Sequence, residues 1–481
     1  MPRRPLRVTT ADGVRLRSAL DALRADLQVR RDFPAGVLAE AEEAARDPRL
    51  PGYDATDVPF FTVDPPGSLD LDQAMHLAVR EGGRGYRVSY AIADAAAFVA
   101  PGGALDAEAH RRVQTLYFPD VRVPLHPTVL GEGAASLLAG QDRPAVLWRI
   151  DLDADGAVTD VDVRRALVRS RARLDYAGVQ HAIDAGTAEE PVALLRTVGR
   201  LREAQERARG GISLNVPEQE VVELDGGYAL RYRAPLPADA WNAQISLLTG
   251  MVAAGVMLRS GTGILRTLPL APHGEVARLR RVAAALRIDW PHMTSYAELV
   301  RTLDPERTTH AAFLHEATSL FRGADYTPFW PGHPAEPAVH AAVAEAYTHC
   351  TAPLRRLVDR YAAEFCLAAV AGHEPPEWVE AAFRDLPGAM RGGSHFAGTI
   401  ESASLDLVEA ALLKDRVGEV FDAYVIDVKD SDPTAGTVHL RDPAVVARVR
   451  GGTAPLPLGE PLAVRLTQAD PGRHTVLFTP A

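Results

Sequence analysis

Residues 61–73 read Phe-Thr-Val-Asp-Pro-Pro-Gly-Ser-Leu-Asp-Leu-Asp-Gln. The apolar run that ends at Val63 predicts a strand, and the Pro-Pro-Gly that follows Asp64 predicts a turn. Asp70 and Asp72 come directly after this turn, so three carboxylates are expected close together. Mg²⁺ and Mn²⁺ prefer such hard oxygen ligands, and crowded carboxylates are unfavourable without a neutralising cation. The stretch therefore predicts a divalent-cation site, with an acidic surface turn as the alternative.

The length and charge of the chain limit its class. Its 481 residues suggest about three domains of roughly 150 residues each. Apolar residues make up 47% and charged residues 24%, which is typical of a folded soluble protein and not of a disordered chain. The 52 basic and 63 acidic residues give a net charge of −11. A chain this acidic does not attract polyanions by its overall charge, so a nucleic-acid partner requires a local basic channel.

Other features exclude several protein classes. Lys414 and Lys429 are the only lysines and neither lies in a phosphate-loop motif, so we expect no nucleotide cofactor. Cys350 and Cys366 are too few for a zinc site or a disulfide scaffold, which indicates a reducing compartment. The first residues lack the apolar segment of a secretory signal. The longest apolar run, 245–258, is shorter than the roughly 20 residues of a membrane span, so it predicts a buried helix. We therefore expect a cytoplasmic protein with no membrane partner.

Apolar periodicity divides the chain into three parts and predicts a multidomain α+β protein. Residues 1–50 are predicted to form a small helical module, with helices at 14–29 and 34–45. This module either reads DNA as a helix pair or packs against the remainder as an arm. Residues 51–412 are predicted to form a large mixed α/β domain, and residues 413–481 an OB-type β-barrel.

The same pattern predicts the individual elements of the two larger parts. Strands of the large domain are predicted at 58–63, 86–92, 145–152 and 158–168. Helices are predicted at 192–209, 238–258, 339–371 and 400–413, and helical patterns dominate between 258 and 413. The five barrel strands are predicted at 421–428, 436–440, 445–449, 462–466 and 475–478.

A second acidic stretch, 151–162, resembles a calcium-binding loop. Such a loop is flanked by helices, whereas the residues on both sides of this stretch alternate as strands do. A hairpin turn at Asp155 and Gly156 accounts for the acidic residues without a metal. We therefore predict a β-hairpin and no calcium site here.

Two arginine-rich segments are candidates for binding phosphate. Arg355 and Arg356 follow Pro353 at the predicted start of a helix, where they either clamp phosphate or form a structural network with Asp359. A predicted strand carries five more arginines, which either line a channel or lie on a solvated edge. These five are Arg164, Arg165, Arg169, Arg171 and Arg173.

Six segments, in order, resemble the catalytic RNB domain of the ribonuclease II and ribonuclease R family. The family's acidic signature places four acidic residues where this chain has Asp64, Asp70, Asp72 and Gln73. The other resembling segments are 90–94, 115–127, 135–143, 347–356 and 413–418, and the last leads into a C-terminal OB-type RNA-binding domain. The likeness covers about residues 55 to 481. It implies an RNB catalytic domain at 51–412 with an OB fold at 413–481.

The resemblance also implies an activity. It implies a monomeric 3′→5′ exoribonuclease that hydrolyses single-stranded RNA to nucleoside 5′-monophosphates. Mg²⁺, or Mn²⁺, would be held by Asp64, Asp70, Asp72 and Gln73 and would lower the pKa of a bound water. Asp70, Asp72 and Arg355 are the implied catalytic residues, and Arg355 would stabilise charge on the phosphoryl oxygens.

RNA contacts are implied at five positions. Tyr117 would stack on a base near the 3′ end, and Leu214 lies where the family has a second stacking aromatic. Arg356 would grip phosphate. Glu401 would contact the 2′-OH, which selects RNA over DNA, with a solvated helix carboxylate as the alternative. Tyr176 completes this set of predicted RNA-binding residues.

Departures from the family pattern bear on catalysis. Gln73 replaces a metal-binding carboxylate, Leu214 replaces an aromatic, and the adjacent glutamates usual around 246–249 are absent. The first 50 residues are too short for the paired cold-shock domains usual upstream. The barrel has few candidates for base stacking, namely Phe421, Tyr424 and Phe478. Two alternatives therefore stay open: a catalytically inactive RNA-binding relative, and a regulatory DNA binder that uses residues 1–50.

Overall fold

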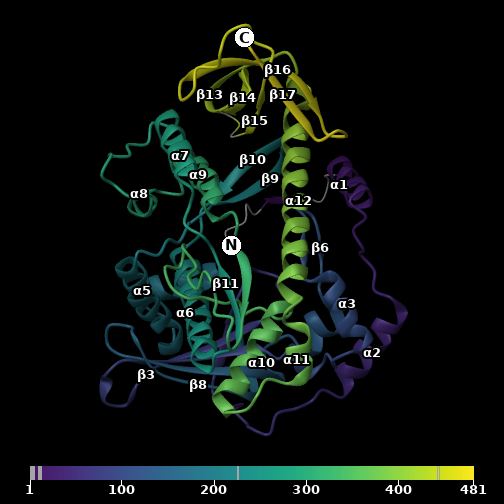
Figure 1. The fold of residues 1–481 in the computed structure, drawn as a ribbon, viewed down its shortest axis with the longest axis vertical. Helices are drawn as coiled ribbons and strands as arrows, with labels where there is room; N and C mark the ends of the chain where they lie inside the picture. The colour runs from purple at the N-terminus through teal and green to yellow at the C-terminus, as the bar shows by residue number, and fades with distance from the viewer. Residues whose placement is uncertain (1–5, 9–13, 225–226, 441–442, 444) are drawn as a thin grey trace.

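A computed structural model describes residues 6–8, 14–224, 227–440, 443 and 445–481. The molecule is elongated, with a large domain at one end and a small β-barrel at the other (Figure 1). Helix α12 (Leu386–Leu413) runs between these two ends. The predicted multidomain α+β architecture, with a mixed catalytic-type domain and a C-terminal OB-type barrel, is confirmed.

The large domain is built on a closed barrel of five strands in the order β2-β3-β4-β7-β8. Neighbouring strands are antiparallel except β2 and β8, which close the barrel as a parallel pair. Side chains alternate along a strand, so Met75 and Tyr90 join one hydrophobic cluster while Ala74 and Ala91 join another. The strands are β2 (Phe60–Val63), β3 (Gln73–Val79), β4 (Tyr86–Ala93), β7 (Asp142–Leu152) and β8 (Val158–Leu174).

Several helices contribute apolar side chains to the first of these clusters. Four of them are α4 (Tyr176–Asp184), α5 (Glu190–Arg209), α6 (Pro237–Ser260) and α10 (Leu357–Ala371). Among the described residues, α6 alone is long and apolar enough to cross a membrane, but 67% of its apolar window is buried inside the protein. It is therefore a core helix, as its apolar run predicts.

The C-terminal barrel has the order β13-β14-β15-β17-β16 and is closed. Helix α7 (His273–Ala285) packs against β13, and α12 packs against β16 and β17. Phe421 and Phe478 are buried and meet edge to face in the barrel core, so they are not available for base stacking. All five predicted strands are present: β13 (Val420–Lys429), β14 (Asp432–Leu440), β15 (Val446–Val449), β16 (Pro461–Asp470) and β17 (Thr475–Pro480).

The N-terminal helices pack on two different parts of the molecule. Helix α1 (Val14–Asp26) packs through Leu16, Leu20 and Leu23 against α12. Helix α2 (Ala35–Arg46) packs against α3 (Ala104–Arg112). Figure 1 shows α1 beside the upper part of α12 and α2 beside α3 at the side of the large domain. Residues 1–5 and 9–13 of the predicted module lie outside the described residues.

Apolar periodicity does not predict five of the strands that the structure contains outside the two barrels. Strands β11 (Gly263–Thr267) and β12 (Asp325–Phe329) pair with each other. Strand β1 (Leu6–Val8) pairs in parallel with β9 (Glu218–Leu224), which pairs with β10 (Gly227–Arg233). Such pairing joins segments far apart in sequence, which local periodicity does not reveal.

The predicted helix at 339–371 is wrong over its first half. Residues 339–356 form turns and isolated bridges, and α10 begins only at Leu357. Pro353 disfavours helix in the residue before it, and the backbone of Arg355 and Arg356 pairs with residues 114–115 instead. The remaining elements are α8 (Tyr296–Thr302), α9 (Thr308–Ala317), α11 (Glu377–Ala382), β5 (Leu116–Tyr117) and β6 (Arg122–Val123).

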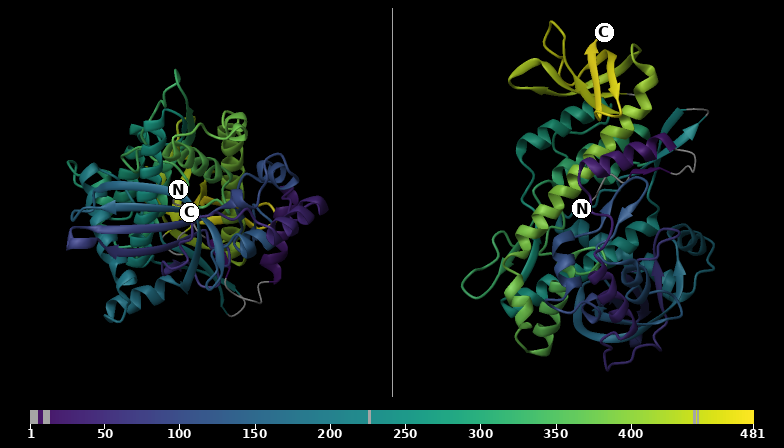
Figure 2. Two further views of the ribbon diagram at one scale, coloured as in Figure 1. Left: turned by 90° about the horizontal axis from the view of Figure 1, so that it is seen from below. Right: turned by 90° about the vertical axis from the view of Figure 1, so that its right-hand side faces the viewer.

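Figure 2 shows how α12 connects the large domain to the C-terminal barrel. The barrel strands of the large domain lie side by side beneath the helices in the view from below. In the side view α12 runs the length of the molecule to the C-terminal barrel, with α1 crossing it. Contacts of α12 with β5, α1 and β12 tie this helix to the large domain as well.

Candidate active site

The acidic stretch lies at the rim of the large-domain barrel. Asp64 directly follows β2, and its backbone N–H donates to the carbonyl of Leu174 at the end of β8 (3.1 Å). Asp70 and Asp72 precede β3. Ser136 fixes the loop between them, because its hydroxyl accepts from the N–H of Leu71 (2.9 Å) and donates to the carbonyl of Leu69 (2.6 Å). The 135–143 segment that resembles the family thus supports the acidic loop.

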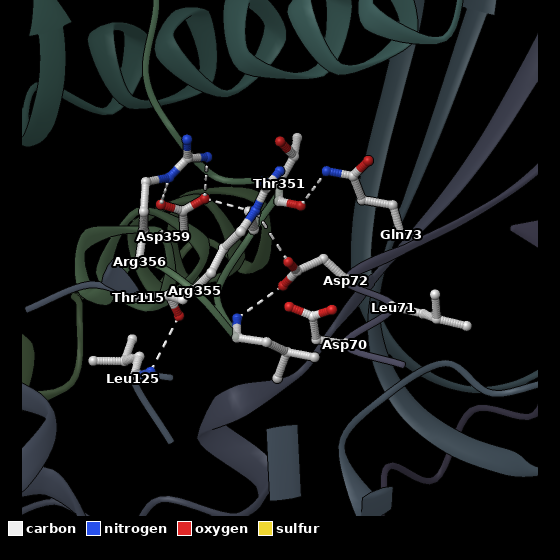
Figure 3. A network of polar contacts seen from close by, with 12 residues as sticks. Asp70, Leu71, Asp72, Gln73, Thr115, Leu125, Thr351, Arg355, Arg356 and Asp359 are labelled. Carbon is white, nitrogen blue, oxygen red and sulfur yellow. Dashed lines mark hydrogen bonds and ion pairs between the residues drawn. The ribbon is translucent and has the colours of Figure 1, made fainter. Parts of the chain in front are cut away.

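Asp72 is the most buried of the three carboxylates, with 4% of the residue exposed. One oxygen accepts from the backbone N–H of Leu354 (2.8 Å), and the other lies 3.4 Å from Nε of Arg355. Figure 3 shows the Asp72 carboxylate directed toward Arg355, with the Asp70 carboxylate beside it. Residues about 280 apart in sequence therefore meet at Asp72.

Asp70 has a cationic partner that the sequence did not indicate. Arg122 of β6 forms an ion pair with Asp70 and a second one with Glu132 (2.8 Å). Asp70 is therefore partly neutralised by the protein itself. The roles expected for Asp70, as a metal ligand and as a catalytic residue, stay predictions.

Gln73 is directed away from the carboxylates. Its Nε2 donates to the carbonyl of Thr351 (2.6 Å), and its Oε1 accepts from the hydroxyl of Tyr90 (2.8 Å). Figure 3 shows the amide aimed at Thr351 and not at Asp70. The carbonyl oxygen of Gln73 is engaged by Tyr90, and its role as a metal ligand stays a prediction.

Arg355 joins the acidic loop to a predicted RNA-binding residue. Its side chain is 44% exposed and lies against the Asp72 carboxylate. The phenol of Tyr117 forms a hydrogen bond with Arg355, which helps to raise the pKa of that guanidinium against the opposing effect of burial. Tyr117 itself is 42% exposed on β5. Arg355 thus contacts the exposed phenol of Tyr117 on one side and the buried carboxylate of Asp72 on the other.

Arg356 has a structural partner. Its Nε and one terminal nitrogen both donate to the fully buried carboxylate of Asp359 (2.9 Å each). Asp359 also accepts from the N–H of Ala352 (2.7 Å). Of the two interpretations of Arg356, the structure shows the ion pair with Asp359.

Two carboxylates of the site hold their protons unusually tightly. Burial raises the pKa of Asp72 to about 7, although Arg355 and the N–H of Leu354 oppose the rise. Burial raises the pKa of Asp64 to about 6, with Arg355 opposing and Asp70 adding to the rise. Both anions therefore lack sufficient neutralisation from the protein alone.

The donor set fits one divalent cation. Oδ2 of Asp64 is buried and has no hydrogen-bond partner, and such an orphaned carboxylate oxygen calls for a ligand. Within the described ranges, no three His, Cys, Asp or Glu side chains gather closely enough to complete a metal site. Asp64 and Asp72 fit a cation such as Mg²⁺ that keeps several water ligands.

The other predicted RNA-binding residues lie in three different surroundings. Tyr176 begins α4; its hydroxyl accepts from Asn242 (3.1 Å), and its pKa is raised by burial and by nearby Asp64. Leu214 is partly buried and packs against apolar clusters at α8 and α9, so it is a packing residue. Glu401 follows Ile400, which packs against Leu116 and Phe118.

The strand arginines and the second acidic stretch have structural partners. Arg165 pairs with Asp94 (2.7 Å) and with Glu364, and Arg169 pairs with Asp142 (2.5 Å). Residues 151–162 form the predicted β7–β8 hairpin, and Asp151 pairs with Arg87 (2.7 Å). Of the strand arginines, Arg173 reaches the acidic loop: it donates to the carbonyl of Ser68 (3.3 Å), and its charge opposes the rise in the pKa of Asp64.

The chain matches the RNB domain over residues 53–371 and the RNase II-type exonuclease C-terminal S1 domain over residues 419–481. It belongs to the RNB-domain ribonuclease family. Ribonuclease R of Escherichia coli K12 is 26% identical over 420 residues, which cover 82% of this chain and 50% of that protein. The chain spans about half the length of the curated RNB relatives it matches.

Two solved structures show the same fold. RNase R of Mycoplasma genitalium, in complex with ribose-methylated single-stranded RNA, has a TM-score of 0.80 at 18% identity and covers 97% of this chain and 78% of that one. Yeast Ssd1, described as a pseudonuclease, has a TM-score of 0.65 at 15% identity and covers 95% of this chain and 57% of that one. The RNB fold thus occurs in proteins described as a nuclease and as a pseudonuclease.

Proposed function

We propose that this RNB-family chain is a 3′→5′ exoribonuclease that hydrolyses single-stranded RNA to nucleoside 5′-monophosphates with Mg²⁺ or Mn²⁺. One observation carries the proposal: Asp64 and Asp72 of the acidic stretch, Tyr117 of β5 and Arg355, from three separate segments, lie together and offer the groups that phosphodiester hydrolysis uses. Ribonuclease R, among the relatives, supports the same activity.

Each residue of the site has a distinct task in this proposal. Asp64 and Asp72 would hold the cation. When bound, the cation supplies a water of lowered pKa and neutralises phosphate charge. The guanidinium of Arg355, exposed beside Asp72, would donate to phosphoryl oxygens as their charge increases. Leu354 holds Asp72 in a fixed rotamer through its N–H, so the carboxylate is preorganised.

The substrate end would be held by the exposed aromatic at the entrance. Tyr117 would stack on a base near the 3′ end, which contributes on the order of 1–3 kcal/mol. Because the same phenol bonds to Arg355, base stacking and phosphate binding would be coupled. Glu401, on the turn of α12 next to β5, would accept from the ribose 2′-OH and select RNA over DNA.

A catalytically inactive RNA-binding protein is the second candidate. The observation that favours it is Gln73, whose amide occupies the fourth position of the acidic signature and is turned toward Thr351. The likeness to a described pseudonuclease is in line with it. The two candidates differ in one respect: only the first predicts that RNA is shortened.

The test is identification of the products. The protein is incubated with single-stranded RNA that carries a label at the 5′ or the 3′ end, with Mg²⁺, Mn²⁺ or EDTA. The proposed function predicts immediate release of a 3′-terminal nucleoside monophosphate, gradual shortening of the 5′-labelled strand, and neither in EDTA. DNA of the same sequence should persist. Binding of RNA without shortening under all conditions would instead establish the second candidate.

We further propose that the protein acts in the cytoplasm as a monomer, with single-stranded RNA as its partner. Cys350 and Cys366 are buried free thiols, in keeping with a reducing compartment. Size-exclusion chromatography with light scattering checks the monomer.

A further inference from the structure

We propose that Gln73 is a positioning residue that holds the loop bearing Arg355 through a chain of neutral hydrogen bonds from Ser246 and Tyr90 to Thr351. The inference rests on the proposed function, because it concerns how that active site is held in shape. It assigns a task to a side chain that the acidic signature alone would place among the metal ligands.

The chain of hydrogen bonds crosses the domain from α6 to the catalytic loop. Ser246 Oγ lies 2.8 Å from the hydroxyl of Tyr90, which donates to Gln73 Oε1 (2.8 Å). Nε2 of Gln73 then donates to the carbonyl of Thr351 (2.6 Å). The single proton of the Tyr90 hydroxyl points to Gln73, so Ser246 is the donor to Tyr90. All the bonds then run in one direction.

This chain requires an amide at position 73. Gln73 must accept from Tyr90 on one side and donate to Thr351 on the other. A carboxylate accepts but does not donate, so it would set an anionic oxygen against the Thr351 carbonyl in a low-dielectric interior. Burial keeps the Tyr90 phenol neutral by raising its pKa, so it remains a donor.

Thr351 is the first residue of the loop 351–356, which is also held further along, where the carbonyl of Arg355 accepts from the N–H of Thr115 (3.0 Å). Ala352 donates from its N–H to Asp359 (2.7 Å), and Leu354 donates to Asp72 (2.8 Å). Arg355 lies directly after Leu354. Loss of the Gln73 contact would release the start of the loop and loosen the approach of Arg355 and Leu354 to Asp72.

Two departures from the family's acidic pattern meet in this chain. Gln73 stands at the fourth position of the signature, and Ser246 stands in the stretch where adjacent glutamates are usual. Both contact the same phenol, that of Tyr90. Neutral hydrogen bonds thus connect Ser246 and Gln73, through Tyr90, where the family has acidic residues. The expected cation ligands are then Asp64 and Asp72.

Gln73→Glu tests the proposal, because it keeps the size of the side chain, removes the donor and sets an anionic oxygen against the Thr351 carbonyl. We expect kcat to fall on the order of 10–100-fold, with less change in KM. The dissociation constant of Mn²⁺, measured by titration without RNA, should change little. Hydrogen exchange of the 351–356 amides should accelerate, because the loop loses its first attachment.

A matched control and a milder variant complete the experiment. Gln205 donates from its side-chain amide to the carbonyl of Asp155 (3.0 Å) at an exposed site, so Gln205→Glu makes the same change elsewhere and should leave all three measurements unaltered. Tyr90→Phe removes one hydroxyl from the chain without charge. It should produce a smaller change in the same direction, and it serves if Gln73→Glu does not fold.

Two results would overturn the proposal. One is tighter or additional Mn²⁺ binding by Gln73→Glu with undiminished kcat, which would make position 73 a ligand position. The other is unchanged hydrogen exchange of the loop in both variants. If the wild type does not degrade RNA, the proposed function fails, but the exchange measurement still tests the chain of hydrogen bonds.

Discussion

Asp72 is held by a backbone N–H and an arginine in a place from which water is nearly excluded. Its pKa is raised to about 7 because burial outweighs those two donors. The protein neutralises the negative charge of this carboxylate only in part, and a bound cation would neutralise the remainder. The buried, charged Asp72 carboxylate therefore lowers the free energy of unfolding of the cation-free protein.

Asp72→Asn should stabilise the cation-free protein at about pH 8 while it abolishes activity. The folded state binds the Asp72 proton more tightly than the unfolded state, so stability is greatest below the ordinary carboxyl pKa and is lost as pH rises toward 7. Removal of the charge should recover roughly 2–4 kcal/mol at most. Urea unfolding with EDTA measures this. Asp142→Asn, at an exposed ion pair, should give no gain, and a less stable Asp72→Asn would contradict the account.

Cation binding should depend steeply on pH between about 5 and 7. Asp64, with a pKa of about 6, and Asp72, with a pKa of about 7, must both lose their protons before they bind a divalent ion. Affinity for Mn²⁺ should therefore fall as the pH is lowered through this range, with proton release on binding. Calorimetry in buffers of different ionisation enthalpy measures both quantities. An affinity that is constant across the range would exclude these two residues as the ligands.

Two substitutions at Tyr117 separate its two expected tasks. Tyr117→Phe keeps the ring and removes the hydrogen bond to Arg355, so kcat should fall with KM nearly constant. Tyr117→Ala also removes the stacking surface, and RNA affinity should drop on the order of 5–100-fold. Single-turnover kinetics and binding to a non-hydrolysable RNA distinguish the two effects. Equal affinity of the two variants for RNA would mean that Tyr117 does not stack.

At the level of elements, α1 supports the hairpin β5–β6 that carries Tyr117 and Arg122. Arg24 of α1 is 3% exposed and donates twice to Asp120, between the two strands (2.7 and 3.0 Å). Its guanidinium also lies over the ring of Phe118 (5.2 Å). Helix α1 thus supports the hairpin that carries Tyr117. This contact favours a packing role for residues 1–50 over DNA binding.

Arg24→Met should destabilise the β5–β6 hairpin, because the Asp120 carboxylate loses its cationic partner. Breaking a buried ion pair from one side costs about 3–5 kcal/mol, because Asp120 remains buried without its partner. We expect a lower melting temperature and a raised KM for RNA. The double variant Arg24→Met/Asp120→Asn removes both charges and should recover most of the stability. Failure of the double variant to recover would show that packing of Arg24, not its charge, is what matters.

Sequence reasoning recovered features that are encoded locally. The five strands of the C-terminal barrel follow from alternation and turns, and the acidic loop follows from its own residues. The family resemblance brought Arg355 and Tyr117 into the same expected site. Helix periodicity was equally sufficient for α5 and α6, whose apolar side chains are buried in the core.

What sequence reasoning missed depends on contacts between distant segments. Gln73 meets Thr351 across 278 positions, and no local pattern distinguishes an amide that binds a carbonyl from one that binds a metal. The Arg122 pair with Asp70 and the parallel pairing of β1 with β9 are of the same kind. Residues 339–356 look helical by composition but their backbone is bound by other elements.

Across the whole molecule, the account depends on one claim: the carboxylates at the barrel rim and Arg355 form a working hydrolytic centre despite Gln73. The most direct measurement is a time course on 5′-labelled single-stranded RNA with Mn²⁺, Mg²⁺ or EDTA, comparing the wild type with Asp72→Asn. We predict stepwise shortening to very short ends by the wild type with either metal, none in EDTA, and none with Asp72→Asn, which should still bind RNA. RNA that stays full length with the wild type in both metals, or that Asp72→Asn shortens at the same rate, would contradict the claim.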